Sequence, residues 1–138
     1  MRIGSADRPP RILFVNDEDM IVEMVTEMLG ELGYEAVGEL CCDRALEVFA
    51  GSPERFDLVI LDHGLPGTTG IDVAEEFLKL RPGIPILLHT GSMDEELEEK
   101  ARAAGIKGVI RKPLTTAELA AAIEEVLVKD GTQIAGGT

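Results

Sequence analysis

The sequence has little of three things: cysteine, basic side chains and long apolar segments. Its two cysteines, Cys41 and Cys42, are adjacent, a poor geometry for a disulfide, so we expect reduced thiols and a cytoplasmic protein. No apolar run approaches the length of a membrane span, and no apolar segment of the secretory type follows the first residues. We therefore do not expect a secreted, disulfide-stabilised or membrane-spanning protein.

Lysine and arginine number 13 against 26 aspartates and glutamates, which gives a formal net charge of −13. This shortage of basic surface argues against direct binding of DNA, RNA or an anionic membrane. Acidity favours cation binding and a basic partner surface, although acidity that only keeps the protein soluble would explain most of these carboxylates as well. With 138 residues, of which 45 % are apolar, the chain is long enough for one domain with a proper core.

Short apolar runs alternate with segments of helical periodicity along the chain. The pattern predicts strands at residues 11–15, 34–40, 58–61, 86–89 and 108–110. It predicts helices that start after residue 18 and end at Gly33, at 43–50, at about 70–80, at 93–104, and from 115 to the apolar stripe ending at Leu127. Such alternation requires a parallel sheet covered on both faces. Residues 1–10 are predicted as a flexible lead or linker, 11–130 as the domain and 131–138 as a flexible tail.

Four chemically distinct residues follow four of the predicted strands: Asp17, Asp62, Thr90 and Lys112. The carboxyl ends of parallel strands meet at one edge of a sheet, so we expect these side chains to converge. Asp17 and Asp62 can supply carboxylate oxygens to Mg²⁺, and the backbone carbonyl of Gly64 could supply another. A carboxylate can also attack phosphorus, while the Lys112 ammonium and the Thr90 hydroxyl would stabilise phosphoryl oxygens. The sequence thus predicts Asp62 as a phosphoacceptor.

Together these residues resemble the receiver domains of two-component response regulators, over residues 11–128. The motifs that carry the resemblance are, in chain order, Asn16–Glu18, Asp57–Asp62, Leu65–Gly67 with Gly70, Thr90, and Lys112–Pro113. The resemblance implies a flavodoxin-like (βα)5 fold with a five-stranded parallel sheet of order 2-1-3-4-5. Pro66, Gly67 and Pro113 would shape the loops of the site.

The resemblance also implies a phosphorelay function. A sensor histidine kinase or a histidine phosphotransfer protein would donate the phosphoryl group, with Mg²⁺ as cofactor and Mn²⁺ as a substitute. The domain would be no enzyme beyond catalysing its own phosphorylation and dephosphorylation. The change would be relayed through the fourth helix, the fifth strand and the fifth helix, with no contact to nucleic acid or membrane; a weak homodimer stays open. Residues 90–114 look like receivers fused to hybrid sensor histidine kinases.

Several positions depart from the family pattern. Asn16 stands where an acid is usual, so we expect weaker Mg²⁺ binding, with the amide acting through a metal-bound water. Gly64 and Gly91 are small, which would leave the site open to water or to a bulky donor. Val109 replaces the aromatic residue often found three positions before the lysine, so the usual coupling of Thr90 to an aromatic switch is in doubt.

Other interpretations remain open at this stage. The four residues could have ordinary roles, with Asp62, Asp17 and Thr90 capping helices and Lys112 lying on the surface. Asn16 and Val109 favour a non-phosphorylated interaction module that keeps only the fold. A phosphatase of the dehalogenase type would need an aspartate where the chain has Gly64, and neither a phosphate-binding loop nor a dinucleotide fingerprint is present.

The histidines and methionines carry no function in this interpretation. Mg²⁺ prefers oxygen ligands, so His63 and His89 are predicted to be hydrogen-bonded structural residues. Met20, Met24 and Met28 are predicted to pack the first helix or, where exposed, to contact a partner.

Overall fold

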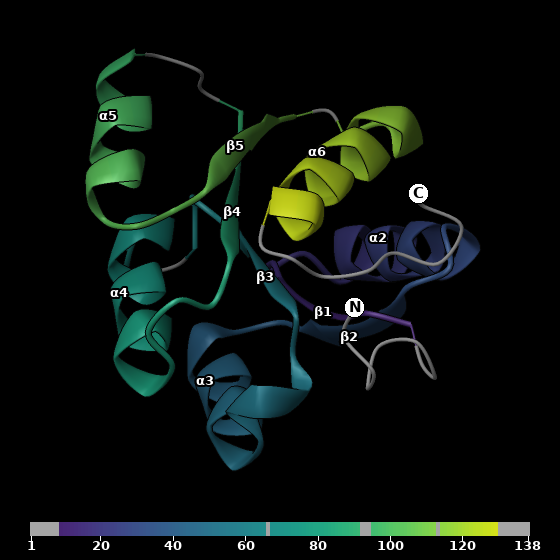
Figure 1. The fold of residues 1–138 in the computed structure, drawn as a ribbon, viewed down its shortest axis with the longest axis horizontal. Helices are drawn as coiled ribbons and strands as arrows, with labels where there is room; N and C mark the ends of the chain where they lie inside the picture. The colour runs from purple at the N-terminus through teal and green to yellow at the C-terminus, as the bar shows by residue number, and fades with distance from the viewer. Residues whose placement is uncertain (1–8, 66, 92–94, 113, 130–138) are drawn as a thin grey trace.

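Five strands and five α-helices alternate along residues 9–65, 67–91, 95–112 and 114–129, the part of the chain described by this computed structural model (Figure 1). The strands are β1 (Arg11–Val15), β2 (Glu35–Glu39), β3 (Leu58–Asp62), β4 (Ile86–Thr90) and β5 (Gly108–Arg111). The helices are α2 (Asp19–Glu31), α3 (Cys42–Gly51), α4 (Gly70–Leu80), α5 (Glu95–Ala103) and α6 (Thr116–Lys129), with a short 3₁₀ helix η1 (Pro53–Arg55). Every predicted element is confirmed with small shifts at its ends; the predicted helix start at Met93 lies outside the described residues.

The strands form one parallel sheet in the order β2-β1-β3-β4-β5, which confirms the predicted topology. Helices α3, α4 and α5 cover one face and α2 and α6 cover the other (Figure 1). Asp62 pairs with His89 across β3 and β4, and Thr90 pairs with Arg111 across β4 and β5. The carboxyl ends of the strands therefore meet at one edge, where the predicted site residues lie.

Burial on both faces explains the continuous apolar runs of β1, β3 and β4. All five residues of β3 and all five of β4 are buried, because helices cover both faces of these strands. Alternate residues enter two separate core clusters: Leu13, Val59 and Leu88 face α3, α4 and α5, whereas Phe14 and Ile60 face α2 and α6. The edge strand β2 is only partly buried along its length.

Three polar contacts close the sheet at the edge opposite the candidate site. The carboxylate of Asp57, which is buried, accepts a hydrogen bond of 2.8 Å from the backbone N–H of Arg11. The guanidinium of Arg81, after α4, donates to the backbone carbonyls of Pro53, at 3.0 Å, and Phe56. These contacts hold the connection before β3 against β1 and against the end of α4.

The two ends of the chain contribute differently to the described part. Most of the predicted lead and all of the predicted tail at 131–138 lie outside the described residues. Pro10, at the end of the predicted lead, is buried, and its carbonyl accepts a hydrogen bond of 2.9 Å from the N–H of Glu35. The packed structure therefore includes Pro10, one residue before the predicted start of the domain.

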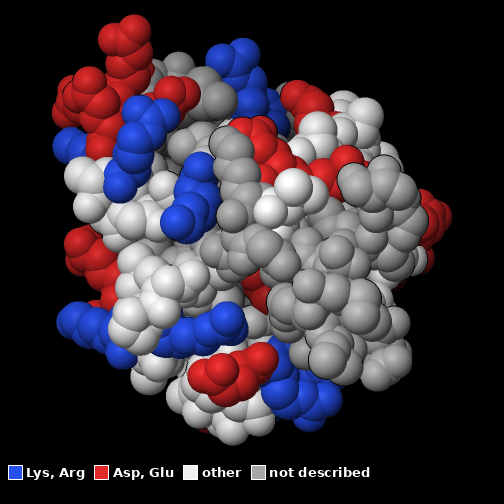
Figure 2. Space-filling model, in the orientation of Figure 1, with Lys and Arg blue, Asp and Glu red and all other residues white. Residues whose placement is uncertain are grey.

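Helix α5 differs from the other helices in its high charge. Its first turn carries Glu95, Glu96 and Glu98, and its last turn carries Lys100 and Arg102. Figure 2 shows acidic and basic side chains crowded at the upper left, where Figure 1 places this helix. Only Ala101 of α5 is buried, so the helix has a narrow contact with the rest of the domain.

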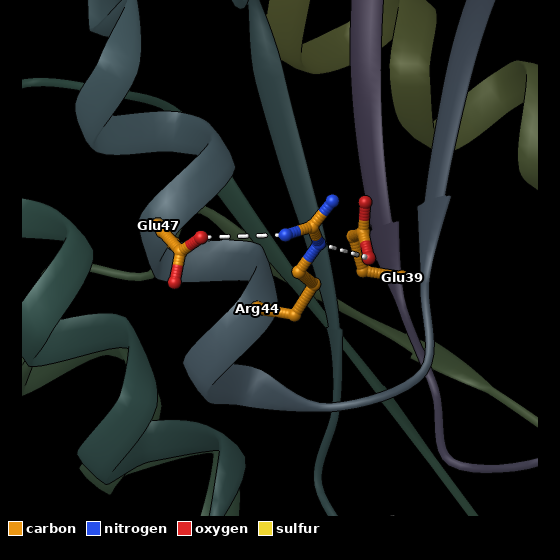
Figure 3. Close-up of polar contacts among 3 residues, drawn as sticks. All are labelled: Glu39, Arg44 and Glu47. Carbon is orange, nitrogen blue, oxygen red and sulfur yellow. Dashed lines mark hydrogen bonds and ion pairs between the residues drawn. The ribbon is translucent and has the colours of Figure 1, made fainter.

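Arg44 on α3 links the end of β2 to the helix that follows it (Figure 3). Its Nε lies 3.8 Å from Oε1 of Glu39, and its Nη1 lies 3.3 Å from Oε1 of Glu47. The backbone carbonyl of Glu39 also accepts a hydrogen bond of 3.2 Å from the N–H of Asn16, which joins the ends of β1 and β2. Since Arg44 is exposed, its ion pairs contribute little to stability, on the order of a few tenths of a kcal/mol.

The two cysteines lie at the start of α3 and differ in exposure. Cys41 is exposed at the N-cap of α3, whereas Cys42 packs against the core cluster under α3, and both thiols are free. None of the described helices has the length and apolar content needed to cross a bilayer.

Candidate functional site

A buried carboxylate and an ammonium meet at the carboxyl edge of the sheet. Asp62 is the last residue of β3 and is 3 % exposed. The backbone N–H of Lys112 donates to the carbonyl of Thr90 at 2.8 Å, which extends the β4–β5 pairing by one residue. This places Nζ of Lys112 2.7 Å from Oδ1 of Asp62. The structure therefore brings together two of the four residues that sequence analysis selected, across the intervening strand β4.

Helix α4 has its own cap, so Asp62 is not needed for that purpose. Thr69 is the N-cap residue, and its Oγ1 accepts a hydrogen bond of 3.1 Å from the N–H of Asp72. Gly70, the first residue of α4, donates its N–H to the carbonyl of His63 at 3.2 Å. The alternative role of Asp62 as a helix cap is thus excluded, and the carboxylate remains available for chemistry.

Asn16 and Asp17 follow β1 and have different surroundings. Asn16 is 2 % exposed, and its Oδ1 accepts a hydrogen bond of 2.8 Å from the N–H of Glu18, which forms a local turn before α2. An amide oxygen has a second lone pair, so this turn still leaves room for a metal-bound water. Asp17 is exposed and does not cap α2, whose N-cap is Glu18 without a side-chain hydrogen bond.

Oxygen atoms of Asp62 and Gly64 lie at this edge, where the sequence predicts a hard, partly hydrated cation. No three acidic, histidine or cysteine side chains converge as a metal cluster within the described ranges. A cation here would therefore rely on Asp17, Asp62, the carbonyl of Gly64 and water. That set matches Mg²⁺, which usually keeps several waters and takes one or two carboxylates. Oδ2 of Asp62 is directed toward Gly64, since it lies 3.8 Å from where a Cβ of that residue would be.

The remaining predicted site residues lie on β4 and β5 and in the loops after β3 and β4. Thr90 ends β4 and is 4 % exposed. Gly91 follows it and is exposed, and a Cβ there would lie 3.9 Å from Cδ of Lys112. Val109 on β5 is half-buried and packs against the core cluster under α5, and Gly67 has a left-handed φ of 75°. The predictions for Pro66 and Pro113 lie outside the described residues.

His89 contradicts the prediction of a hydrogen-bonded histidine. It is 3 % exposed, and neither ring nitrogen has a hydrogen-bond partner within the described part of the chain. Its ring lies 6.1 Å from that of Phe14, on the face of the sheet covered by α2 and α6. Burial lowers the pKa of His89 to about 4, with a further decrease from Lys112 and an opposing effect of Asp62. Nδ1 of His63 is also buried without a partner among those residues, and the prediction for this histidine stays a prediction.

The sequence itself indicates that the imidazole of His89 is buried. The apolar run Ile86–Leu88 continues directly into His89, and alternation along a strand puts His89 on the same face as Leu87. A polar residue in that position of a doubly covered strand is buried. What the pattern could not show is that its neighbours offer no hydrogen bond.

The fold and the acidic edge together define a flavodoxin-like α/β domain with a carboxylate–lysine pair at the ends of its strands. Within that class, the chain belongs to the response regulator receiver domain family, whose model matches residues 12–124. Receiver domains are signalling domains of two-component systems and not classical enzymes. As a family they bind Mg²⁺ at the phosphorylation site and interact with histidine kinases or phosphotransfer proteins.

Curated relatives include both regulators and a sensor protein. The transcriptional regulatory protein PdtaR of Mycobacterium tuberculosis is 39 % identical over 116 residues, which are 84 % of this chain and 56 % of the relative. The phosphate regulon regulatory protein PhoB of Pseudomonas aeruginosa is 34 % identical over 122 residues, 87 % of this chain and 52 % of the relative. The aerobic respiration control sensor protein ArcB of Escherichia coli is 32 % identical over 117 residues, 83 % of this chain and 15 % of the relative. The chain thus spans about half the length of the two regulators.

Two solved structures with the same fold align with this chain over nearly their whole length. A response regulator receiver domain protein of Clostridium thermocellum superposes with a TM-score of 0.83 at 26 % identity, over 88 % of this chain and 97 % of the other. The chemotaxis protein CheY4 of Vibrio cholerae superposes with a TM-score of 0.81 at 27 % identity, over 86 % of this chain and 99 % of the other. The described fold is therefore the fold of these two solved structures.

Proposed function

We propose that this domain accepts a phosphoryl group from a phosphohistidine onto Asp62 and returns to its resting state by hydrolysis. The observation that carries the proposal is the buried Asp62 carboxylate with Nζ of Lys112 at 2.7 Å from its Oδ1. A sensor histidine kinase or a histidine phosphotransfer protein would be the donor. A carboxylate held at the end of a central strand, with one ammonium beside it, is a suitable nucleophile for phosphoryl transfer.

The two carboxylate oxygens of Asp62 have separate tasks in this mechanism. Lys112 holds Oδ1, whereas Oδ2 lies on the side of Gly64. An oxygen of Asp62 forms a bond to phosphorus as the bond from phosphorus to the donor imidazole nitrogen breaks, and the released imidazole takes up a proton. Mg²⁺, held by Asp17, Asp62 and the Gly64 carbonyl, would neutralise charge on the phosphoryl oxygens.

Small residues beside Asp62 support a site that water can reach. Gly64 and Gly91 are both exposed, and neither places a side chain over the carboxylate. Water can then attack phosphorus opposite the Asp62 oxygen, which breaks the phosphorus–oxygen bond and restores the carboxylate. Lys112 would follow the phosphoryl group while it is present, and the Thr90 hydroxyl would donate to one of its oxygens.

The narrow packing of α5 supports the proposed relay through α5, β5 and α6. Movement of Thr90 and Lys112 toward a phosphoryl group would pull on the connections before α5 and after β5. Because Ala101 is the only buried residue of α5, that helix can shift at low cost in core contacts. Val109, half-buried on β5, replaces a bulky ring with a small side chain, so the proposed response depends on the backbone more than on an aromatic switch.

The test of the acceptor is Asp62→Asn with a small phosphodonor such as phosphoramidate in the presence of Mg²⁺. We expect wild-type chain to gain one phosphoryl group by intact-protein mass spectrometry and Asp62→Asn to gain none. Asp43→Asn is the matched control, since Asp43 is an exposed carboxylate on α3, and it should be labelled like wild type. Labelling of Asp62→Asn to the wild-type extent would reject the assignment.

A non-phosphorylated interaction module is the second candidate, because Oδ1 of Asn16 is already engaged by the N–H of Glu18 at 2.8 Å. Beryllofluoride, which imitates a phosphoryl group on a carboxylate, separates the two functions. A phosphoacceptor should show Mg²⁺-dependent chemical-shift changes around Asp62, Thr90 and Lys112 when beryllofluoride is added. If these shift changes and the labelling of Asp62 are both absent, the non-phosphorylated interaction module is favoured.

A further inference from the structure

A groove of about 460 Å³ lies between α2 and the segment that follows β5. Its apolar wall is formed by Ile21 and Met24 of α2 and by Leu114, and its volume falls within the range of small-molecule sites. Ile21 and Leu114 also pack against the core cluster on the face of the sheet covered by α2 and α6, so the groove lies on that face. Met24, at its rim, is 41 % exposed and can adapt its shape to an occupant.

The inner part of this groove contains His89, which is 97 % buried and lacks a hydrogen-bond partner within the described residues on both ring nitrogens. An unpaired polar group in a protein interior costs free energy, and an apolar residue at the same position would avoid that cost. The groove is the route by which a hydrogen-bonding group can reach this ring. The buried imidazole is therefore a second observation, independent of the groove, that points to an occupant.

The charges along the groove favour a neutral occupant. Lys112 lines the groove, but its ammonium is held by Asp62 at 2.7 Å, and the acidic residue Glu18 lines the groove as well. An anion would meet Glu18 and a cation would meet Lys112, so neither gains from the groove as a whole. A neutral imidazole offers one donor and one acceptor, which suits a hydroxyl or an N–H group.

We propose that the groove binds a neutral, largely apolar small molecule whose hydroxyl or N–H group hydrogen-bonds to His89 while its apolar part lies against Ile21, Met24 and Leu114. Such a molecule would also contact Lys112, which faces both the groove and Asp62. Occupancy would restrain Lys112 and slow phosphorylation of Asp62; this regulatory consequence rests on the proposed function, whereas the binding does not.

Phenol is the probe for the binding, with toluene as the control of similar shape and benzoate as the charged control. Titrations followed by NMR on the unphosphorylated full chain, without Mg²⁺, should show saturable shifts at Met24, Ile21 and Leu114. We expect phenol to bind about threefold to tenfold more tightly than toluene, the gain of one net hydrogen bond, and benzoate to bind more weakly than phenol. Equal affinities of phenol and toluene, no saturable binding of phenol, or shifts confined to other surfaces would each overturn the proposal.

Substitutions then test the part played by the ring. His89→Leu should remove the preference for phenol over toluene, whereas His63→Leu, which changes the histidine that does not line the groove, should keep it. A preference that survives His89→Leu would overturn the proposal. Leucine suits a buried apolar position, and retained binding of toluene shows that the variant is folded. Asp62→Asn should still bind phenol, so loss of labelling and loss of phenol binding report on the two proposals separately.

Discussion

At the scale of single residues, the buried imidazole of His89 makes the stability of the fold depend on pH. Burial lowers the pKa of His89 to about 4 in the folded protein, whereas the unfolded chain has the ordinary value of 6.5. The unfolded chain therefore binds more protons between these values, and the free energy of unfolding decreases as pH falls from about 7 toward 4. The whole loss is at most about 3 kcal/mol.

The loss of stability caused by His89 can be separated from the loss caused by protonated carboxylates. Measurements above about pH 5 achieve this, because most carboxylates are still ionised there. Urea unfolding at about pH 7 and about pH 5 should show a clear loss of stability for wild type and a smaller loss for His89→Leu. At about pH 7 we expect His89→Leu to be as stable as wild type or more stable by about 1 kcal/mol, since it removes an unpaired buried group. Identical pH dependence of the two proteins would contradict the interpretation.

Two glycines near Asp62 differ sharply in the space around them. A Cβ at Gly70 would lie 2.4 Å from Cδ1 of Leu88 and 3.0 Å from the backbone oxygen of Asp62. Among the described residues, a Cβ at Gly64 would meet only Oδ2 of Asp62, at 3.8 Å. We expect Gly70→Ala to cost about 1–3 kcal/mol in urea unfolding, because a backbone atom cannot move aside cheaply. Gly64→Ala is the matched control and should stay within about 0.5 kcal/mol of wild type. Equal free energies of unfolding for Gly70→Ala and Gly64→Ala would show that the loop after Asp62 can shift at little cost to accommodate the added methyl group.

The residue scale is also where sequence analysis fell short. The apolar run ending in Asp62 predicted a carboxylate at a strand end, and strand order was enough to expect Lys112 near it. The hydrogen bond from the N–H of Glu18 to Asn16, by contrast, depends on the local turn, and the missing partners of His89 depend on side chains from α2 and β1. Such facts are set by three-dimensional neighbours that periodicity does not identify.

At the scale of elements, α5 and α4 lie on the same face of the sheet but are packed to different degrees. Helix α4 buries Gly70, Val73, Ala74 and Phe77, whereas α5 buries Ala101 alone. A hollow of about 560 Å³ separates parts of the two helices, lined by Ile71 and Leu97 among others. We expect the amides of α5 to exchange with solvent through local opening at lower free energy than those of α4. Native-state hydrogen exchange measures this, and equal protection of the two helices would count against a mobile α5.

The elements themselves were largely predictable because local signals and tertiary packing agree. Thr115 and Glu118 have the spacing that typically starts a helix, and Oγ1 of Thr115 accepts a hydrogen bond of 3.1 Å from the N–H of Glu118. Doubly covered strands show as unbroken apolar runs, which is why β1, β3 and β4 were found with small errors. The edge strand β2 was predicted one residue too long at each end, because its half-buried side chains give a weaker pattern.

At the scale of the whole molecule, the net charge of −13 should make the folded state sensitive to ionic strength. Self-repulsion destabilises a compact acidic chain, whereas most of the described ion pairs are exposed and contribute little. Raising sodium chloride from about 0.02 M to about 0.2 M shortens the range of the repulsion, so the urea midpoint should rise. Asp62→Asn should respond to sodium chloride in the same way, which separates this general effect from cation binding at the site. A midpoint that falls with salt would mean that attractive pairs outweigh the repulsion.

The core cluster on the α2 and α6 face determines when the domain can finish folding during its synthesis on the ribosome. That cluster joins Phe14, near the start of the chain, to Leu119, Ile123 and Leu127 in the last helix. A nascent chain that has produced all five strands therefore still carries a sheet face that α2 alone covers until α6 leaves the exit tunnel. The domain must complete its folding late and nearly at once, and during translation the waiting face is a natural binding surface for molecular chaperones.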